Sequence, residues 1–320
     1  MFVPNKMDPE YRVKKYIGNL HNEILVRQSG LALDPLKGMN VYSFHNYQTK
    51  DFPEINGSYY HDMTRYLSLT PHLHDSQFLF FVGDTSVKYD VPIFVKTRPS
   101  SDFGYGVLMD LDHSRHFNPL SVVDQEDTIP FHEKKNVLIW RGATTGPGFD
   151  EKPHRRHTSR ATLVSQYCQT ANKYIDVGLS SMTNTVKTSS QGDYYSQFLK
   201  PSISLPDLLS YKFHLSVEGH DVATNLKWVL YSNCVPFCPP FFVQSWILED
   251  ELIPWTHYIP VKGDYSDLDK QVEWAMGHPT ACQKIAQEGR HYIEQFLDLE
   301  QEAHIRQSVL EHYVKNVKII

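Results

Sequence analysis

A cation, a flexible backbone and two hydroxyl groups follow one another directly after the apolar run Val137 to Trp140. These residues are Arg141, Gly142, Ala143, Thr144, Thr145 and Gly146. A guanidinium group beside glycine backbone suits close approach to a phosphate. The alternative is that Arg141 pairs with a surface carboxylate and that the glycines only form a turn. Further cations follow at Arg155, Arg156 and Arg160, the last of which opens a predicted helix.

The stretch from Lys212 to Trp228 combines a predicted strand, an acidic turn and a helix start. Asp221 is placed to cap that helix, whose N-terminus would present N–H groups and partial positive charge to an anion. We predict that Glu218 accepts hydrogen bonds from ribose hydroxyls and that Asn225 and Lys227 lie near phosphates. Alternatively, Glu218 and Asp221 only cap the helix.

Asp84 is the predicted general base. It follows the apolar run Phe78 to Val82, and so is expected at the rim of a crevice where a carboxylate can take a proton from an attacking hydroxyl. An aspartate after a glycine is alternatively a simple turn residue.

The seventeen histidines invite a metal-site interpretation. Two clusters stand out, His72 to Asp75 and His113 to His116, but neither has a third ligand at a recognisable spacing. Among the four cysteines, only Cys234 and Cys238 lie close together, without a second pair at zinc spacing. We therefore predict no metal ligand and no metal cofactor.

Apolar runs that end abruptly in glycine or a charged residue are typical of buried parallel strands. Such runs are Phe78 to Val82, Pro92 to Val95, Val137 to Trp140 and Phe213 to Val217. Helical spacing lies between runs of this kind, for example over Val222 to Leu230, and the tail from Asp267 to Lys315 carries mostly helical residues. This order predicts an α/β fold with doubly wound sheets.

A chain of 320 residues with 41% hydrophobic content can bury a sizeable core in one or two domains. Polar and charged residues interrupt the apolar pattern between Asp124 and Lys135, so we predict domains over residues 1–128 and 129–320. The formal charge of −6 gives no basic field that would attract nucleic acid.

Targeting signals are not evident in the sequence. The first residues have no apolar core of signal-peptide length, and no stretch approaches the roughly 20 apolar residues that span a bilayer. We expect a soluble, cytoplasmic protein, and leave open a peripheral association with the inner face of the membrane.

Five segments, read in order, resemble glycosyltransferase family 90, which contains protein O-glucosyltransferases, capsule-associated xylosyltransferases and lipopolysaccharide-modifying enzymes. They are Trp140 to Gly142, Lys212 to Trp228, Ser232 to Asn233, Trp255 to Val261 and Asp264 to Leu268. The resemblance implies a GT-B architecture, in which two Rossmann-like domains face one another across a cleft. It also implies a UDP-sugar donor, no metal, and inversion at the anomeric carbon.

The resemblance carries over to individual residues. Asp84 looks like the family's catalytic aspartate, and Lys227 matches a basic position on the later helix. The residues that match the nucleotide-binding loop are Arg141, Gly142, Thr144 and Arg160. Asn225 departs from the animal enzymes, which have arginine there, so one contact to the diphosphate is lost or supplied elsewhere.

The sequence of residues 217–228 is more similar to that of bacterial members of the family. The resemblance then implies transfer of glucose or xylose to a lipopolysaccharide or another cell-envelope glycan. The C-terminal domain is expected to bind the donor and the N-terminal domain the acceptor. The alternatives are a protein O-glycosyltransferase and a nucleotide-sugar or carbohydrate-binding protein that has lost catalysis; the sugar, the acceptor and the oligomeric state stay open.

Overall fold

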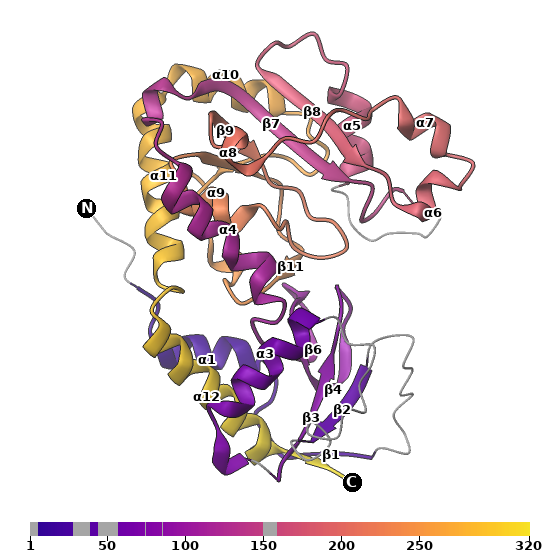
Figure 1. Ribbon diagram of the computed structural model, residues 1–320, viewed down its shortest axis with the longest axis vertical. Helices are drawn as coiled ribbons and strands as arrows, with labels where there is room; N and C mark the ends of the chain where they lie inside the picture. The colour runs from indigo at the N-terminus through magenta and orange to yellow at the C-terminus, as the bar shows by residue number, and fades with distance from the viewer. Residues whose placement is uncertain (1–5, 28–38, 44–56, 74, 85, 150–158) are drawn as a thin grey trace. The chain divides into compact units, whose positions relative to one another are not determined.

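The structure is a computed structural model that describes residues 6–27, 39–43, 57–73, 75–84, 86–149 and 159–320 (Figure 1). The chain forms two compact units. Unit 1 consists of Met1–Ser114, Val243–Glu249 and Gln295–Ile320, and unit 2 consists of Arg115–Phe242 and Asp250–Glu294. Each unit has parallel strands and packed helices, so the predicted α/β class is confirmed.

The sheet of unit 1 has the order β2-β3-β4-β6. Its strands are β2 (Met39–Ser43), β3 (Gln77–Phe81), β4 (Tyr89–Val95) and β6 (Gly104–Leu108). Strand β2 runs antiparallel to β3, whereas β3, β4 and β6 are parallel. The carboxyl ends of these three strands therefore lie at one edge of the sheet.

Two small strand pairs complete the β-structure of unit 1. Strand β1 (Ile24–Val26) pairs in parallel with β13 (Val317–Ile319), and β5 (Arg98–Pro99) pairs antiparallel with β11 (Val243–Gln244). Both pairs join residues that are far apart in the sequence.

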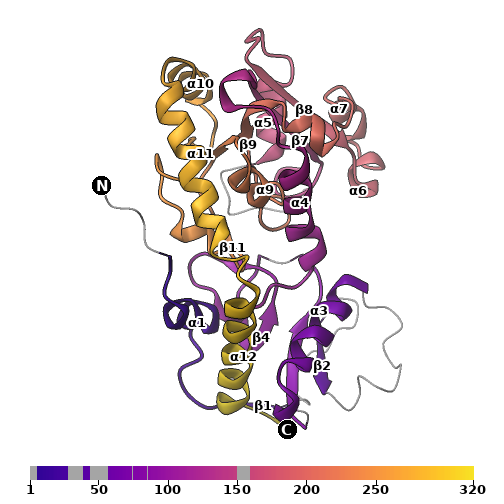
Figure 2. The ribbon, with the colours of Figure 1, turned by 60° about the vertical axis from the view of Figure 1, so that its left-hand side comes forward.

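The helices of unit 1 are α1 (Pro9–Ile17), α3 (Gly57–Ser68) and α12 (Leu299–Asn316), with a short 3-10 turn at Pro71–Leu73. Asp8 caps α1 by accepting the N–H of Glu10 at 2.9 Å. Helix α12 packs against α1, as Figure 2 shows, and Arg12 Nη1 forms a buried ion pair of 2.5 Å with Glu302. This pair ties the last helix of the chain to the first.

Unit 2 is built on five parallel strands in the order β12-β10-β9-β7-β8. They are β7 (Lys135–Ala143), β8 (Ile175–Ser181), β9 (Tyr211–Leu215), β10 (Val235–Cys238) and β12 (Ile259–Pro260). After β7 the chain forms β8 on one side and then returns to form β9 on the other. The sheet is therefore doubly wound, and its order reverses between β7 and β9.

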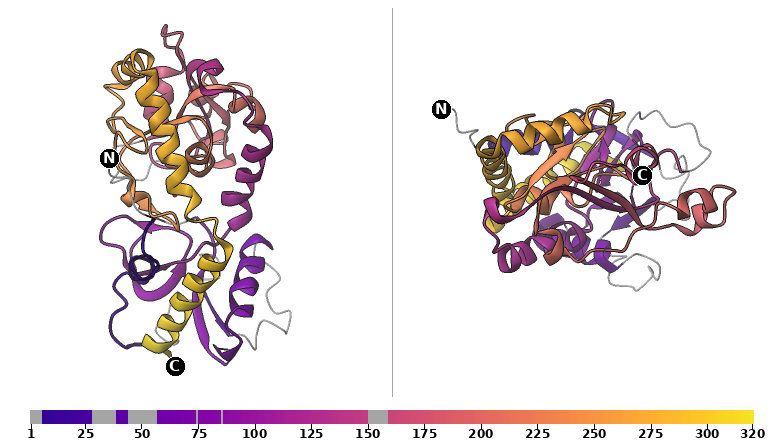
Figure 3. Two further views of the ribbon diagram at one scale, coloured as in Figure 1. Left: turned by 90° about the vertical axis from the view of Figure 1, so that its left-hand side faces the viewer. Right: turned by 90° about the horizontal axis from the view of Figure 1, so that it is seen from above.

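The helices of unit 2 differ widely in length. They are α4 (His113–Glu126), α5 (Arg160–Tyr167), α6 (Asn184–Lys187), α7 (Gly192–Ser196), α8 (Leu205–Leu208), α9 (Leu226–Tyr231), α10 (Leu268–Gly277) and α11 (Pro279–Glu294). The first two residues of α4 are assigned to unit 1. Further 3-10 turns lie at Phe131–Glu133 and Glu249–Glu251. Helix α11 packs against α9 and β10 (Figure 3).

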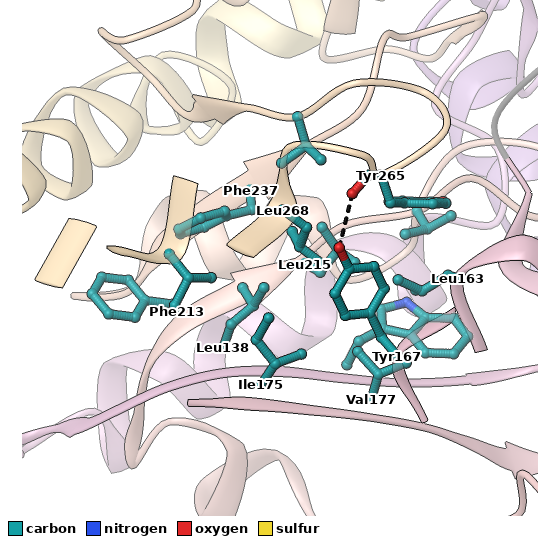
Figure 4. Close-up of a cluster of buried hydrophobic side chains, with 14 of the residues drawn as sticks. Leu138, Leu163, Tyr167, Ile175, Val177, Phe213, Leu215, Phe237, Tyr265 and Leu268 are labelled. Atoms are coloured by element: carbon teal, nitrogen blue, oxygen red, sulfur yellow. Dashed lines mark hydrogen bonds between the residues drawn. The ribbon is translucent and has the colours of Figure 1, made fainter. Parts of the chain in front are cut away.

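The core of unit 2 lies between the sheet and the helices α5, α10 and α11 (Figure 4). Strands β7, β8 and β9 contribute Leu138, Val177 and Phe213, all at most 1% exposed. The Tyr167 hydroxyl donates to the Tyr265 carbonyl oxygen at 3.0 Å, which ties α5 to the loop after β12. The core thus fixes the strands whose carboxyl ends carry the candidate residues.

The four predicted strand runs are confirmed, and the predicted helical tail forms α10, α11 and α12. The division of the chain is more complex than one cut: unit 2 begins at Arg115, and the chain returns to unit 1 for residues 243–249 and 295–320. The assignment of residues 1–128 to the acceptor and 129–320 to the donor stays a prediction. No helix in the described part of the chain is long and apolar enough to span a membrane.

Candidate functional site

The loops after β7 and β9 meet at the point where the strand order of unit 2 reverses. Gly146, in the first loop, has a φ of +90°, and a Cβ on it would lie 2.6 Å from the carbonyl oxygen of Gly219 in the second loop. Only glycine allows this backbone conformation together with so close an approach. Ligands of open α/β sheets bind in the crevice beside such a reversal. The two loops therefore form the candidate ligand site of unit 2.

Arg160 joins these two loops from the first turn of α5. Its Nη1 donates to Thr145 Oγ1 at 2.6 Å, and its Nη2 donates to the Val217 carbonyl oxygen at 3.0 Å. Burial lowers the pKa of Arg160 to about 10, so it stays charged at neutral pH. Its hydrogen-bond acceptors within the described residues are uncharged oxygens, and the charges of Asp221 and Glu218 act on it to raise its pKa. A buried cation with acidic residues nearby therefore lies at the meeting point of the loops.

Arg141 is placed differently from the prediction. Strand β7 continues to Ala143 because Arg141 pairs with Gly178 of β8, so Arg141 lies within the strand rather than after it. Its Nη2 forms an ion pair of 2.8 Å with Asp176, which also accepts from Lys200 at 2.8 Å. Burial opposes the ionisation of Asp176, but these two hydrogen bonds outweigh it and lower its pKa. The carboxylate alternative considered for Arg141 is thus present in the structure.

Gly142 and Thr144 also contribute to the local structure of this strand end. A Cβ on Gly142 would lie 2.4 Å from the Trp140 ring. The buried Thr144 side chain accepts the N–H of Thr183 at 2.8 Å, and Thr183 caps α6. Their predicted contacts to a nucleotide stay predictions. Arg155 and Arg156 lie outside the described residues.

The helix after β9 begins later than predicted, at Leu226, and has only six residues. Residues before it form turns, in which the Gly219 N–H donates to the Asp221 carbonyl oxygen at 2.9 Å, so Asp221 does not cap the helix. Asn225 Nδ2 donates to the Leu215 carbonyl oxygen at 3.1 Å, which holds the turn against the end of β9. The prediction of a helix N-terminus at Asp221 was therefore wrong.

Glu218 and Lys227 occupy different environments in this region. The half-buried Glu218 accepts the N–H of Phe242 at 2.9 Å through Oε1. The Lys227 residue is only 1% exposed and lies within α9. The structure places Glu218 in the loop after β9, whereas it places Lys227 inside the protein. Their roles toward ribose and phosphate stay predictions.

The predicted place of Asp84 at the rim of a crevice stays a prediction, and in unit 1 this residue lies at the carboxyl edge of the sheet. It follows β3, and its Oδ1 accepts from Nζ of Lys96, the residue that follows β4. Lys96 Nζ also lies 3.9 Å from Oδ2 of Asp112, which follows β6. Ser58 Oγ of α3 donates to Asp112 Oδ1 at 2.8 Å. Two carboxylates and one ammonium group therefore meet at this edge.

The other aspartates of this region are separate from that cluster. Asp110 forms a buried ion pair of 2.6 Å with Arg306, and although burial opposes its ionisation, Arg306 and His113 lower its pKa. Asp102 pairs with Lys88 at 2.8 Å on the surface. Among the ion pairs of the described residues, those of Asp84 and Asp112 share Lys96.

Sequence reasoning gave no site role to Lys96, and it counted Thr145 only among the hydroxyls that follow Trp140. Lys96 follows an apolar run, which is the same signal that pointed to Asp84. A systematic list of polar residues within a few positions of each strand end would have found Lys96. Over the residues that the structure describes, no group of three His, Cys, Asp or Glu is arranged to hold a metal ion.

Comparison with known proteins places this geometry in a family. The model of glycosyl transferase family 90 matches residues 115–319, a segment that contains all of unit 2 and begins after Asp84. The chain is 30% identical over 257 residues to the O-glucosyltransferase LpsA of Dichelobacter nodosus, which covers 80% of this chain and 72% of that protein.

Two further relatives match over shorter segments. Protein O-glucosyltransferase 2 of Danio rerio is 30% identical over 174 residues, covering 54% of this chain and 31% of that protein. Uncharacterized protein 027R of Frog virus 3 is 31% identical over 182 residues, covering 51% of this chain and 18% of that protein. Since the family model matches more than half of the sequence, the chain belongs to glycosyltransferase family 90 and is a glycosyltransferase.

Proposed function

We propose that this chain moves a sugar from a UDP-sugar to a hydroxyl group of a lipopolysaccharide or another cell-envelope glycan, with inversion and without a metal ion. In this proposal the two units adopt the GT-B arrangement, in which two Rossmann-like domains face one another across a cleft. The parallel strands of both units support the Rossmann-like part of the proposal.

The meeting of the β7 and β9 loops around Arg160 is the observation that carries the proposal. A nucleoside diphosphate leaving group develops negative charge as the sugar departs, and a fixed cation stabilises it. Arg160 offers that charge, and Gly146 and Gly219, which have no side chains, let the two loops pack closely beside it. Glu218, in the same loop, is the group that would accept hydrogen bonds from ribose hydroxyls.

The acceptor hydroxyl needs a base, and Asp84 is our candidate. Its carboxylate would take the hydroxyl proton while the new bond to the anomeric carbon forms and the bond to the diphosphate breaks. Its side chain is 28% exposed, whereas Lys96 and Asp112 beside it are nearly buried. Asp84 is therefore the member of the cluster that a substrate can reach.

The similarity to an O-glucosyltransferase favours glucose over xylose as the transferred sugar. The match to protein O-glucosyltransferase 2 supports a second candidate, in which the acceptor hydroxyl belongs to a protein. The two candidates share donor chemistry and differ in the acceptor.

Sugar transfer by the purified protein tests the proposal. UDP release is measured with a panel of UDP-sugars, with and without lipopolysaccharide or a protein acceptor, and the anomeric configuration of the product is read by NMR. We expect acceptor-dependent UDP release, an anomeric configuration opposite to that of the donor, and no effect of EDTA. Loss of turnover in EDTA would contradict the metal-independent mechanism, and retention of configuration would contradict the base role of Asp84.

A further inference from the structure

Lys96 lies between two carboxylates at the carboxyl ends of the unit 1 strands. Its Nζ donates to Asp84 and lies 3.9 Å from Asp112 Oδ2. The three residues follow three different strands, β4, β3 and β6, so the fold rather than local sequence brings them together. Such an arrangement concentrates one positive and two negative charges.

Burial makes the charge of Lys96 effective. The Lys96 side chain is 2% exposed and the Asp112 side chain 6% exposed, so water screens their interaction little. A buried ammonium group requires anionic partners, and Asp84 and Asp112 provide them. Asp84, at 28% exposure, is the partner that also faces solvent.

Asp112 is held in place by its surroundings. Ser58 Oγ fixes Asp112 through a hydrogen bond of 2.8 Å, and the Asp112 backbone has a left-handed φ of +57°. Lys96 Nζ lies 5.8 Å from the centre of the Tyr59 ring, and burial raises the Tyr59 pKa to about 12, against an opposing effect of Lys96. Tyr59 therefore lies beside the ammonium group of this cluster with its own ionisation disfavoured.

We propose that Lys96 is a positioning residue that keeps Asp84 ionised, and so able to accept a proton, against the negative charge of Asp112. Two carboxylates at one site repel, which favours protonation of one of them, whereas a cation between them favours ionisation of both. The inference rests on the proposed role of Asp84 as the base. It assigns Lys96 and Asp112 opposite effects on that base.

The dependence of kcat/KM on pH tests the inference, because its acid limb reports protonation of the base in the free enzyme. Lys96→Met should move the acid limb to higher pH by about 1–3 units, the usual effect of a neighbouring opposite charge. Asp112→Asn should move it to lower pH, and asparagine tolerates the left-handed backbone at that position. A purely structural role of Lys96 would lower activity at all pH values without moving the limb.

A matched control is the exposed pair of Lys88 and Asp102, which has the same chemistry in the same unit. Lys88→Met should leave the acid limb in place. Lys96→Arg keeps the positive charge, so the acid limb of this variant should lie close to that of the wild type. In an Asp84→Asn background, Lys96→Met should change the residual activity by less than about threefold, because the group through which it acts is gone.

The outcomes separate the two proposals. The melting temperature shows whether Lys96→Met folds. If the folded variant has an unmoved acid limb, the inference is overturned while Asp84 stays the candidate base. Wild-type activity in Asp84→Asn overturns the base role itself. If Lys96→Met does not fold, Asp112→Asn decides: a limb shifted to lower pH supports the inference, and an unshifted limb overturns it.

Discussion

The backbones of Gly146 and Gly219 touch across the two loops at the reversal of the unit 2 sheet. A methyl group on Gly146 would lie 2.6 Å from the Gly219 carbonyl oxygen, well inside van der Waals contact. Arg160 then crosses the same junction and donates to Thr145 in one loop and to Val217 in the other. The loop after β7 and the loop after β9 are thus packed together and joined by Arg160.

Gly146→Ala should separate the two loops. The new Cβ clashes with Gly219, and the φ of +90° is unfavourable for alanine, so the free energy of unfolding should fall by about 1–3 kcal/mol. UDP affinity should fall at least about tenfold, the equivalent of roughly 1.4 kcal/mol. Calorimetry measures the UDP affinity, and urea unfolding measures the free energy of unfolding. Gly277→Ala is the control, because a Cβ there meets no atom within 4 Å; equal effects at both positions would contradict the role of the junction.

Arg160→Met should weaken UDP binding by about 1.5–3 kcal/mol, the scale of a lost hydrogen bond to a charged group. The reason is that Arg160 supplies the cation at the loop junction. Melting temperature is measured in parallel, since the substitution also removes the bonds to Thr145 and Val217. Unchanged UDP affinity in the folded variant would exclude Arg160 from the donor site.

Arg141→Ala tests the prediction made from the sequence that Arg141 binds the diphosphate, for which a loss of about 1.5–3 kcal/mol in UDP binding is expected. Its ion pair with Asp176 offers a different role, which Asp176→Asn isolates. Weaker UDP binding in Arg141→Ala but not in Asp176→Asn would confirm the contact. Lower stability in both variants, with UDP affinity unchanged, would assign Arg141 to the sheet.

The difference between these two arginines shows how far the sequence could lead. The strand runs that start at Phe78, Val137 and Phe213 could be recognised locally, and so could the principle that chemistry follows strand ends. The partner of Arg141 could not, because Asp176 lies on β8, a run that mixes Asp, Gly and Ser with its apolar residues. Register between parallel strands is a long-range property, and only the fold revealed it.

The same limit applies to the candidate base. The position of Asp84 after an apolar run could be recognised in the sequence, but its contact with Lys96 depends on the pairing of β3 and β4. The return of α12 to unit 1 was equally hidden, since it depends on buried partners such as Arg12 and Glu302, almost the whole chain apart. Helices could be predicted from spacing, but the surfaces that they cover could not.

Acid should destabilise unit 2 through His214. Its pKa is lowered from 6.5 to about 3 by burial, so the unfolded chain binds more protons between these pH values. Stability should therefore fall as pH drops below about 6.5, at up to about 1.4 kcal/mol per pH unit for this group. His214→Phe should flatten the dependence of urea unfolding on pH, whereas the exposed His132→Gln should not. An unchanged slope in His214→Phe would contradict this account.

Asp84→Asn separates the chemical role of the carboxylate from its packing role. Asparagine keeps the size of the side chain and can still contact Lys96, but it cannot take the proton of the acceptor hydroxyl. Turnover should fall by about 10²–10⁴-fold, the usual contribution of a positioned base, while UDP affinity stays within about threefold. Asp102→Asn is the control, because that carboxylate pairs with Lys88 at the surface. Near wild-type turnover in Asp84→Asn would exclude it as the base, and Asp112, which shares Lys96, would then be the carboxylate to replace.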